Sequence, residues 1–135
     1  MYNLISKIEE KNIILSTNNI TKERGLTLTD REINELIENK NETLNNLSRV
    51  EITPIIDKII YEFYDSSYID NDNYFETIND ITNIFFKYQK EFNNLTDAHI
   101  LKYLKDSFET VCNGAVELLE DTSLLKEQLE EGIYE

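Results

Sequence analysis

Apolar residues recur at alternating steps of four and three between residues 74 and 92, and this spacing constrains the fold more than any other feature. The positions are Tyr74, Ile78, Ile81, Phe85, Tyr88 and Phe92. Such steps place the apolar side chains on one face of a helix. A second set repeats the spacing after Thr96: Leu101, Leu104, Phe108, Val111, Ala115 and Leu118. We therefore expect two long amphipathic helices. Gly114 within the second one indicates close helix packing or a local kink.

Helix start signals divide the rest of the chain. Thr29 followed by Glu32 has the form of a capping box, and it predicts a helix to about residue 47 whose apolar stripe is interrupted by Lys40. Thr53 followed by Pro54 predicts the start of another helix, to about residue 64. Its apolar arc is too wide for a surface helix, so we expect it in the centre of the core.

Asn73, three residues before Glu76, marks the start of the helix over 74–92.

The two ends of the chain carry weaker helix signals. The first 25 residues suit a short helix that carries Leu4, Ile5, Ile8 and Leu15 and ends at Arg24 and Gly25. Leu124, Leu125 and Leu129 suit a last short helix. No strand pair with a hairpin turn is present. The sequence thus predicts one all-α domain over 1–135, an irregular bundle of four to six helices, in which 1–25 and 122–135 have the weakest packing signals.

Charge and cysteine content limit the kinds of binding partner and the cellular compartment that we expect. The net charge is −14, and residues 51–135 hold 19 acidic and 6 basic side chains, against 8 and 7 in residues 1–50. This field repels nucleic acid and anionic lipid, so we expect neither direct nucleic-acid nor membrane binding. Cys112 has no partner for a disulfide, and no apolar run approaches the length of a membrane span. These features favour a cytoplasmic protein.

One acidic stretch resembles a cation-binding loop. Residues 65–76 run from Asp to Glu over twelve positions between two predicted helices, as an EF-hand loop does. The fifth position is Ile69 and the sixth is an Asp where the sharp turn calls for Gly. We therefore favour a solvated turn and no metal. Calcium or magnesium is kept as an alternative, with ligands Asp65, Asp70, Asp72 and Glu76.

Aromatic side chains crowd the same region. Six of them lie within residues 61–75, where Tyr suits either the edge of a core or an interface. The residues that we expect to contact a partner are Tyr64, Tyr68, Asp70, Asp72 and Tyr74. Neither His99 nor Cys112 has the companions that a zinc site or an activated nucleophile needs, and no glycine-rich phosphate loop is present. No catalytic residue and no cofactor are expected.

Several segments resemble a family of uncharacterised small cytoplasmic proteins from Firmicute bacteria. The similar stretches are residues 25–29, 41–44, 49–51, 60–70, 73–74 and 76–77, and the likeness spans about residues 20–120. The family pattern has Pro where Ser67 stands and Gln where Asn71 stands. The resemblance implies a bacterial cytoplasmic origin and no assigned activity.

These observations favour a non-enzymatic protein-interaction or accessory protein, with a protein partner that is basic and with homo-oligomers allowed. One alternative is an acidic mimic of nucleic acid that inhibits a nucleic-acid-binding protein. The second is a cation-binding regulator that uses the 65–76 loop.

Overall fold

The computed structural model describes residues 6–51, 53–123, 125 and 126. Within these ranges the chain forms five α-helices and two short 3₁₀ helices and contains no strand, which confirms the all-α prediction. The elements are α1 (Lys7–Thr21), η1 (Lys22–Arg24), α2 (Asp30–Asn46), α3 (Ile56–Phe63), α4 (Tyr74–Glu91), α5 (Asp97–Thr110) and η2 (Val116–Glu120).

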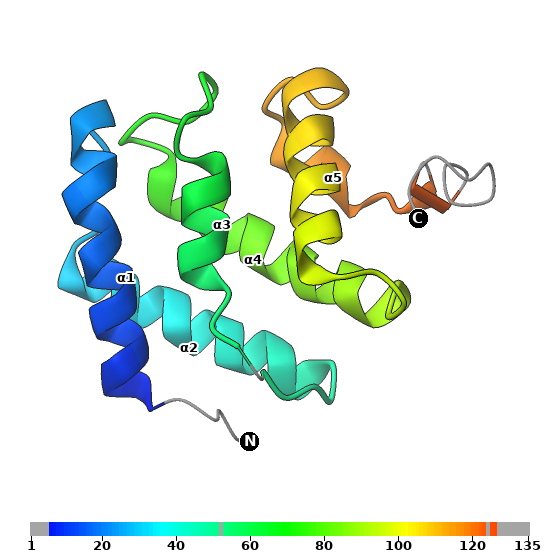
Figure 1. Ribbon diagram of the computed structural model, residues 1–135, viewed down its shortest axis with the longest axis horizontal. Coiled ribbons are helices and arrows are strands. Elements are labelled where there is room, and N and C mark those ends of the chain that lie inside the picture. The colour runs from blue at the N-terminus through cyan, green and yellow to red at the C-terminus, as the bar shows by residue number, and fades with distance from the viewer. Residues whose placement is uncertain (1–5, 52, 124, 127–135) are drawn as a thin grey trace.

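The helices form two layers (Figure 1). α1, α3 and α5 stand side by side, and the central α3 contacts both of the others. α2 and α4 run across this layer and contact each other. Side-chain hydrogen bonds at a constant separation of 40 residues join α2 and the chain just after it to α4: Asn39 with Asn79, Thr43 with Asn83, and Arg49 with Gln89. A constant separation requires that the two helices run in the same direction.

α3 lies in the centre of the core, as its wide apolar arc predicts. Ile56, Ile59, Ile60 and Phe63 are all fully buried. The expected start at Thr53 and Pro54 is wrong, because the helix begins at Ile56 and its N-cap position has no side-chain cap. Residues 51 and 55 are both buried, so the chain already packs in the core before the first turn of the helix begins.

The start of α2 is confirmed in detail. The Thr29 side chain accepts from the Glu32 amide, and the Glu32 carboxylate accepts from the Thr29 amide. Thr96 caps α5 in the same way by accepting from the His99 amide. Gly25 ends η1 with a φ of 76°, a left-handed conformation that glycine adopts without strain.

The end of α5 differs from the prediction. The helix stops at Thr110, and the following residues Asn113 and Gly114 have φ values of 48° and 84°. Two left-handed residues turn the chain back, so Val111 and Leu118 are more than half exposed instead of continuing the apolar stripe. The helical periodicity continued past the point where the backbone leaves the helix.

The N-terminal prediction is partly wrong. Ile8 is exposed, whereas Ile14 is buried and Leu15 packs partly against the core. Leu4, Ile5, Leu124 and Leu129 lie outside the described residues, while Leu125 is fully buried. Among the described helices, none has the length and apolar content that crossing a membrane requires.

Candidate functional site

The chain between α3 and α4, residues 64–73 (the 64–73 loop), is held by side chains from several elements. Arg24, at the end of η1, donates from its two terminal nitrogens to the carbonyl oxygens of Asp65 and Ser66, both at 3.1 Å. The Ser66 hydroxyl donates to Glu109 on α5 at 2.5 Å, and Ser66 is buried. These hydrogen bonds fix the first half of the loop to η1 on one side and to α5 on the other.

The second half of the loop is ordered by its own side chains. One oxygen of Asp70 accepts from the amides of Asp72 and Asn73. Asn73 in turn accepts from the Asp70 amide and donates to the Tyr68 carbonyl oxygen. Asn71 accepts from the Thr27 amide at 3.2 Å. Asp and Asn side chains satisfy turn amides in this way without a bound ion or a second protein. The Asn73 side chain therefore bonds within the loop, and it does not form the side-chain cap that was expected for α4.

Tyr68 lies on the surface but is fixed in orientation. Its ring packs edge-on against Phe108 with centroids 6.0 Å apart, and its hydroxyl donates to Asn113 at 3.3 Å. Gly114 lies directly beneath the ring, where a Cβ atom would be 2.6 Å from the Tyr68 Cγ. The residue as a whole remains 39% exposed. The close packing predicted for Gly114 is present, although it is between two turns and not between two helices.

The predicted cation ligands have separate roles. Asp65 forms an ion pair with Lys105 at 2.7 Å, which holds the pKa of this carboxyl below its usual range. Asp70 accepts loop amides, and Ile69 is buried as a core anchor. Over the part of the chain that the structure describes, no three His, Cys, Asp or Glu side chains are grouped so as to hold a metal ion. Asp65, Asp70, Asp72 and Glu76 are therefore not brought together.

The predicted partner contacts divide by burial. Tyr68, Asp70 and Asp72 are exposed, and Tyr64 is half-buried. The expectation for Tyr74 is wrong, because its side chain is 1% exposed. It is the first residue of α4 and enters the core beneath the loop, where burial raises its pKa to about 12.

The structure also contains a buried charged cluster that was not predicted from the sequence. Lys40 on α2 forms ion pairs with Glu10 on α1 and with Glu51 in the connection to α3 (the Lys40 cluster). The Lys40–Glu51 pair spans 2.7 Å, and none of the three residues is more than 4% exposed. One oxygen of each carboxylate has no hydrogen-bond partner among the residues that the structure describes. Burial raises the pKa of Glu51, with the Lys40 ammonium opposing the shift. A lysine in the middle of an apolar stripe was the available signal.

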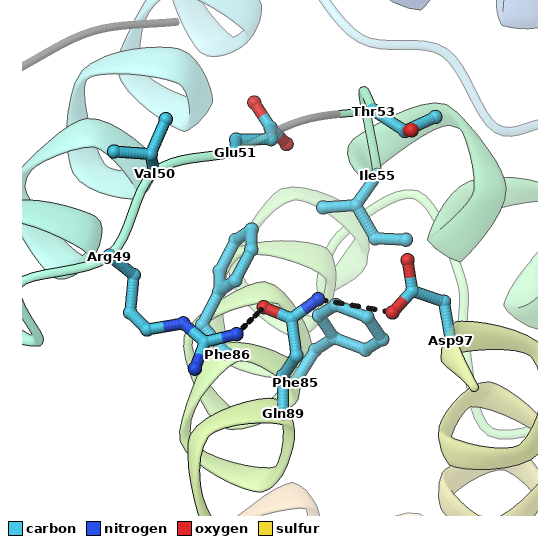
Figure 2. A pocket seen from close by; sticks show the side chains of 9 residues that line it. All are labelled: Arg49, Val50, Glu51, Thr53, Ile55, Phe85, Phe86, Gln89 and Asp97. Atoms are coloured by element: carbon cyan, nitrogen blue, oxygen red, sulfur yellow. Dashed lines mark hydrogen bonds between the residues drawn. The ribbon is translucent and has the colours of Figure 1, made fainter. Parts of the chain in front are cut away.

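A pocket of about 310 Å³ opens next to this cluster, between the α2–α3 connection, the end of α4 and the start of α5 (Figure 2). Glu51 forms part of its wall. Arg49 donates to the side-chain oxygen Oε1 of Gln89 at 3.1 Å, and the side-chain nitrogen Nε2 of Gln89 donates to the Asp97 carboxylate at 3.0 Å. Phe85, Phe86 and Ile55 supply buried apolar walls. None of these residues was predicted as a site from the sequence, since they come from three separate segments.

Arg49 is placed by the way α2 ends. Ser48 has a φ of 56°, and the Arg49 amide donates to the Leu44 carbonyl oxygen at 2.8 Å, as in a Schellman motif. A non-glycine residue in this conformation stores backbone strain, and such strain is common next to functional sites.

Cys112 is buried, as expected for a small apolar residue, and burial raises the pKa of its thiol.

A family of unknown function, DUF6323, matches residues 13–133. The chain belongs to this family, which agrees with the expected resemblance to uncharacterised proteins. No curated protein and no solved structure gives a significant match.

Proposed function

We propose that this protein is a non-enzymatic interaction protein and that the 64–73 loop is its docking element for a basic segment of a protein partner. The observation that carries the proposal is the order of the loop. Hydrogen bonds from η1, to α5 and within the loop fix its position, while Tyr68, Asp70 and Asp72 remain exposed. A surface that is already ordered loses little conformational entropy when a partner binds.

Charge supports the choice of a basic partner. The exposed carboxylates of Asp70 and Asp72 belong to a chain with a net charge of −14. Such a field accelerates encounter with a positively charged surface and disfavours acidic ones. Tyr68 adds an aromatic ring with a polar tip and a restricted rotamer, the type of side chain that often contributes most to an interface.

The test compares two variants of equal charge. Asp70→Asn/Asp72→Asn removes two loop charges, and the amide oxygen of Asn can still accept the turn hydrogen bonds of Asp70. Glu35→Gln/Glu38→Gln removes two charges from the exposed face of α2. Each protein is used as immobilised bait with a lysate of the cells that encode it, and the captured proteins are quantified by mass spectrometry.

The proposal expects a stoichiometric partner that the loop variant captures at least about tenfold less well and that the α2 variant captures like the wild type. Equal capture by all three baits would contradict the loop as docking element. A partner that is a nucleic-acid-binding protein, displaced by added DNA and by salt, would instead favour the mimicry alternative.

A further inference from the structure

The pocket beside the Lys40 cluster has opposite charges at its two ends. Arg49 brings a guanidinium group from the α2–α3 connection, and Asp97 brings a carboxylate from the first turn of α5. Gln89 lies between them and bonds to both, so the two charges are separated by one amide group and two hydrogen bonds (Figure 2). This arrangement holds the charges apart instead of letting them pair directly.

Both end groups retain bonding capacity toward a ligand. Among the described residues, the guanidinium donates to the side chain of Gln89 and keeps further N–H donors, and its planar fork fits a carboxylate with two parallel hydrogen bonds. Only one Asp97 oxygen accepts from Gln89, and the second points away from it, on the side of Ile55 in the view of Figure 2. That oxygen can accept from an ammonium group.

The remaining walls define what lies between the charges. Phe85 and Phe86 are buried, and their rings meet edge-on with centroids 5.3 Å apart. Ile55 adds a third apolar wall, and Glu51 adds a buried carboxylate that Lys40 neutralises only in part. The volume of about 310 Å³ is at the lower end of the range for small-molecule pockets.

We propose that this pocket binds a small zwitterion, an α-amino acid or a close analogue. Its carboxylate pairs with Arg49, and its ammonium group lies on the side of Asp97. The inference is independent of the docking role of the 64–73 loop, because no loop residue lines the pocket.

The first experiment is a thermal-shift screen of the full chain with each proteinogenic L-amino acid at millimolar concentration. A ligand that binds only the folded state raises the Tm, and at concentrations well above Kd the rise is about 4 °C or more. For any compound that binds, the deaminated acid and the decarboxylated amine are tested at the same concentration. The proposal expects that neither reproduces the shift.

Matched variants locate the binding. Arg49→Gln and Asp97→Asn remove one charge each and are expected to abolish the shift, and Asn at position 97 can still accept from Gln89. Arg31→Gln and Asp106→Asn remove the same charges from exposed positions and are expected to keep it. In wild-type protein, the side-chain amide resonances of Gln89 are expected to move with the ligand by NMR, a readout that needs no variant to fold.

Three outcomes would overturn the proposal. The first is a screen in which no amino acid changes either the Tm or the Gln89 resonances. The second is a shift that persists in both pocket variants, which places binding elsewhere. The third is a deaminated acid that binds as well as the amino acid, which reduces the pocket to an anion site.

Discussion

In the 64–73 loop, carboxylate and amide oxygens accept hydrogen bonds from backbone amides at the surface, whereas at Lys40 an ammonium group and two carboxylates are enclosed between helices. Similar side chains are used in both places. In the loop, Asp70 and Asp72 are exposed, so their remaining lone pairs are open to water. In the Lys40 cluster, one oxygen of Glu10 and one of Glu51 have no hydrogen-bond partner within the described part of the chain. The contrast shows that the cost of a charge depends on what surrounds it.

Lys40→Met is expected to have the largest effect, because it leaves Glu10 and Glu51 buried without a counter-charge. The loss in unfolding free energy is about 3–5 kcal/mol at neutral pH, measured by urea denaturation. Lys102→Met, at an exposed ion pair, is the control and should cost less than about 1 kcal/mol. Recovery of most of the loss in Glu10→Gln/Lys40→Met/Glu51→Gln would show that uncompensated charge is the cause. A single variant as stable as the control would refute the contrast.

Gly114→Ala is expected to follow, with a loss of about 2–3 kcal/mol from two additive causes. The φ of 84° strains an L-residue, and the new Cβ would meet the Tyr68 ring at 2.6 Å. Gly25→Ala isolates the first cause, since its φ is 76° with nothing within 4 Å, and it should cost about 1 kcal/mol. Equal losses in thermal unfolding would mean that Tyr68 is not held against Gly114.

Glu51 should link stability to pH in the direction opposite to an ordinary ion-paired carboxylate. Its pKa is raised in the fold, so the folded state binds more protons between the unfolded value near 4.5 and the folded one. The stability of the wild type relative to Glu51→Gln should therefore increase as the pH falls through this window, by up to about 1.4 kcal/mol per pH unit. Parallel urea titrations of both proteins measure the difference. A flat difference would exclude a raised pKa.

Asp65 supplies the smallest effect and the opposite sign. Lys105 lowers its pKa, so its contribution is present above the unfolded value near 3.8 and is lost as the pH falls through the folded value. The Asp65 side chain is 64% exposed, so Asp65→Asn should cost less than about 1 kcal/mol at neutral pH, and less still in high salt. A larger loss by urea denaturation, or one insensitive to salt, would mean that the loop depends on this ion pair.

Local signals predicted the helix starts at Thr29 and Thr96 and the stop at Gly25. Each of them depends on bonds within a few residues. The predicted start at Thr53 is wrong because the residues on either side of it, Glu51 and Ile55, are both buried against distant elements. The predicted end of α5 is wrong for a similar reason, since Gly114 packs against Tyr68, a residue far away in the sequence.

The candidate site divides in the same way. Tyr68, Asp70 and Asp72 were predicted from one continuous stretch, and they are exposed there. Arg49, Gln89 and Asp97 lie too far apart in sequence for any local pattern to join them, and only the packing of α4 against α2 and α5 brings them together.

The sequence by itself determined the helical class, the buried faces and the acidic character, because periodicity and composition act through near neighbours and net charge. Tertiary structure alone decided that Lys40 is a buried cation and not a surface interruption. It also decided that a pocket with opposed charges exists. Each of these depends on which distant groups replace water around a side chain, and that replacement is made only when the helices pack.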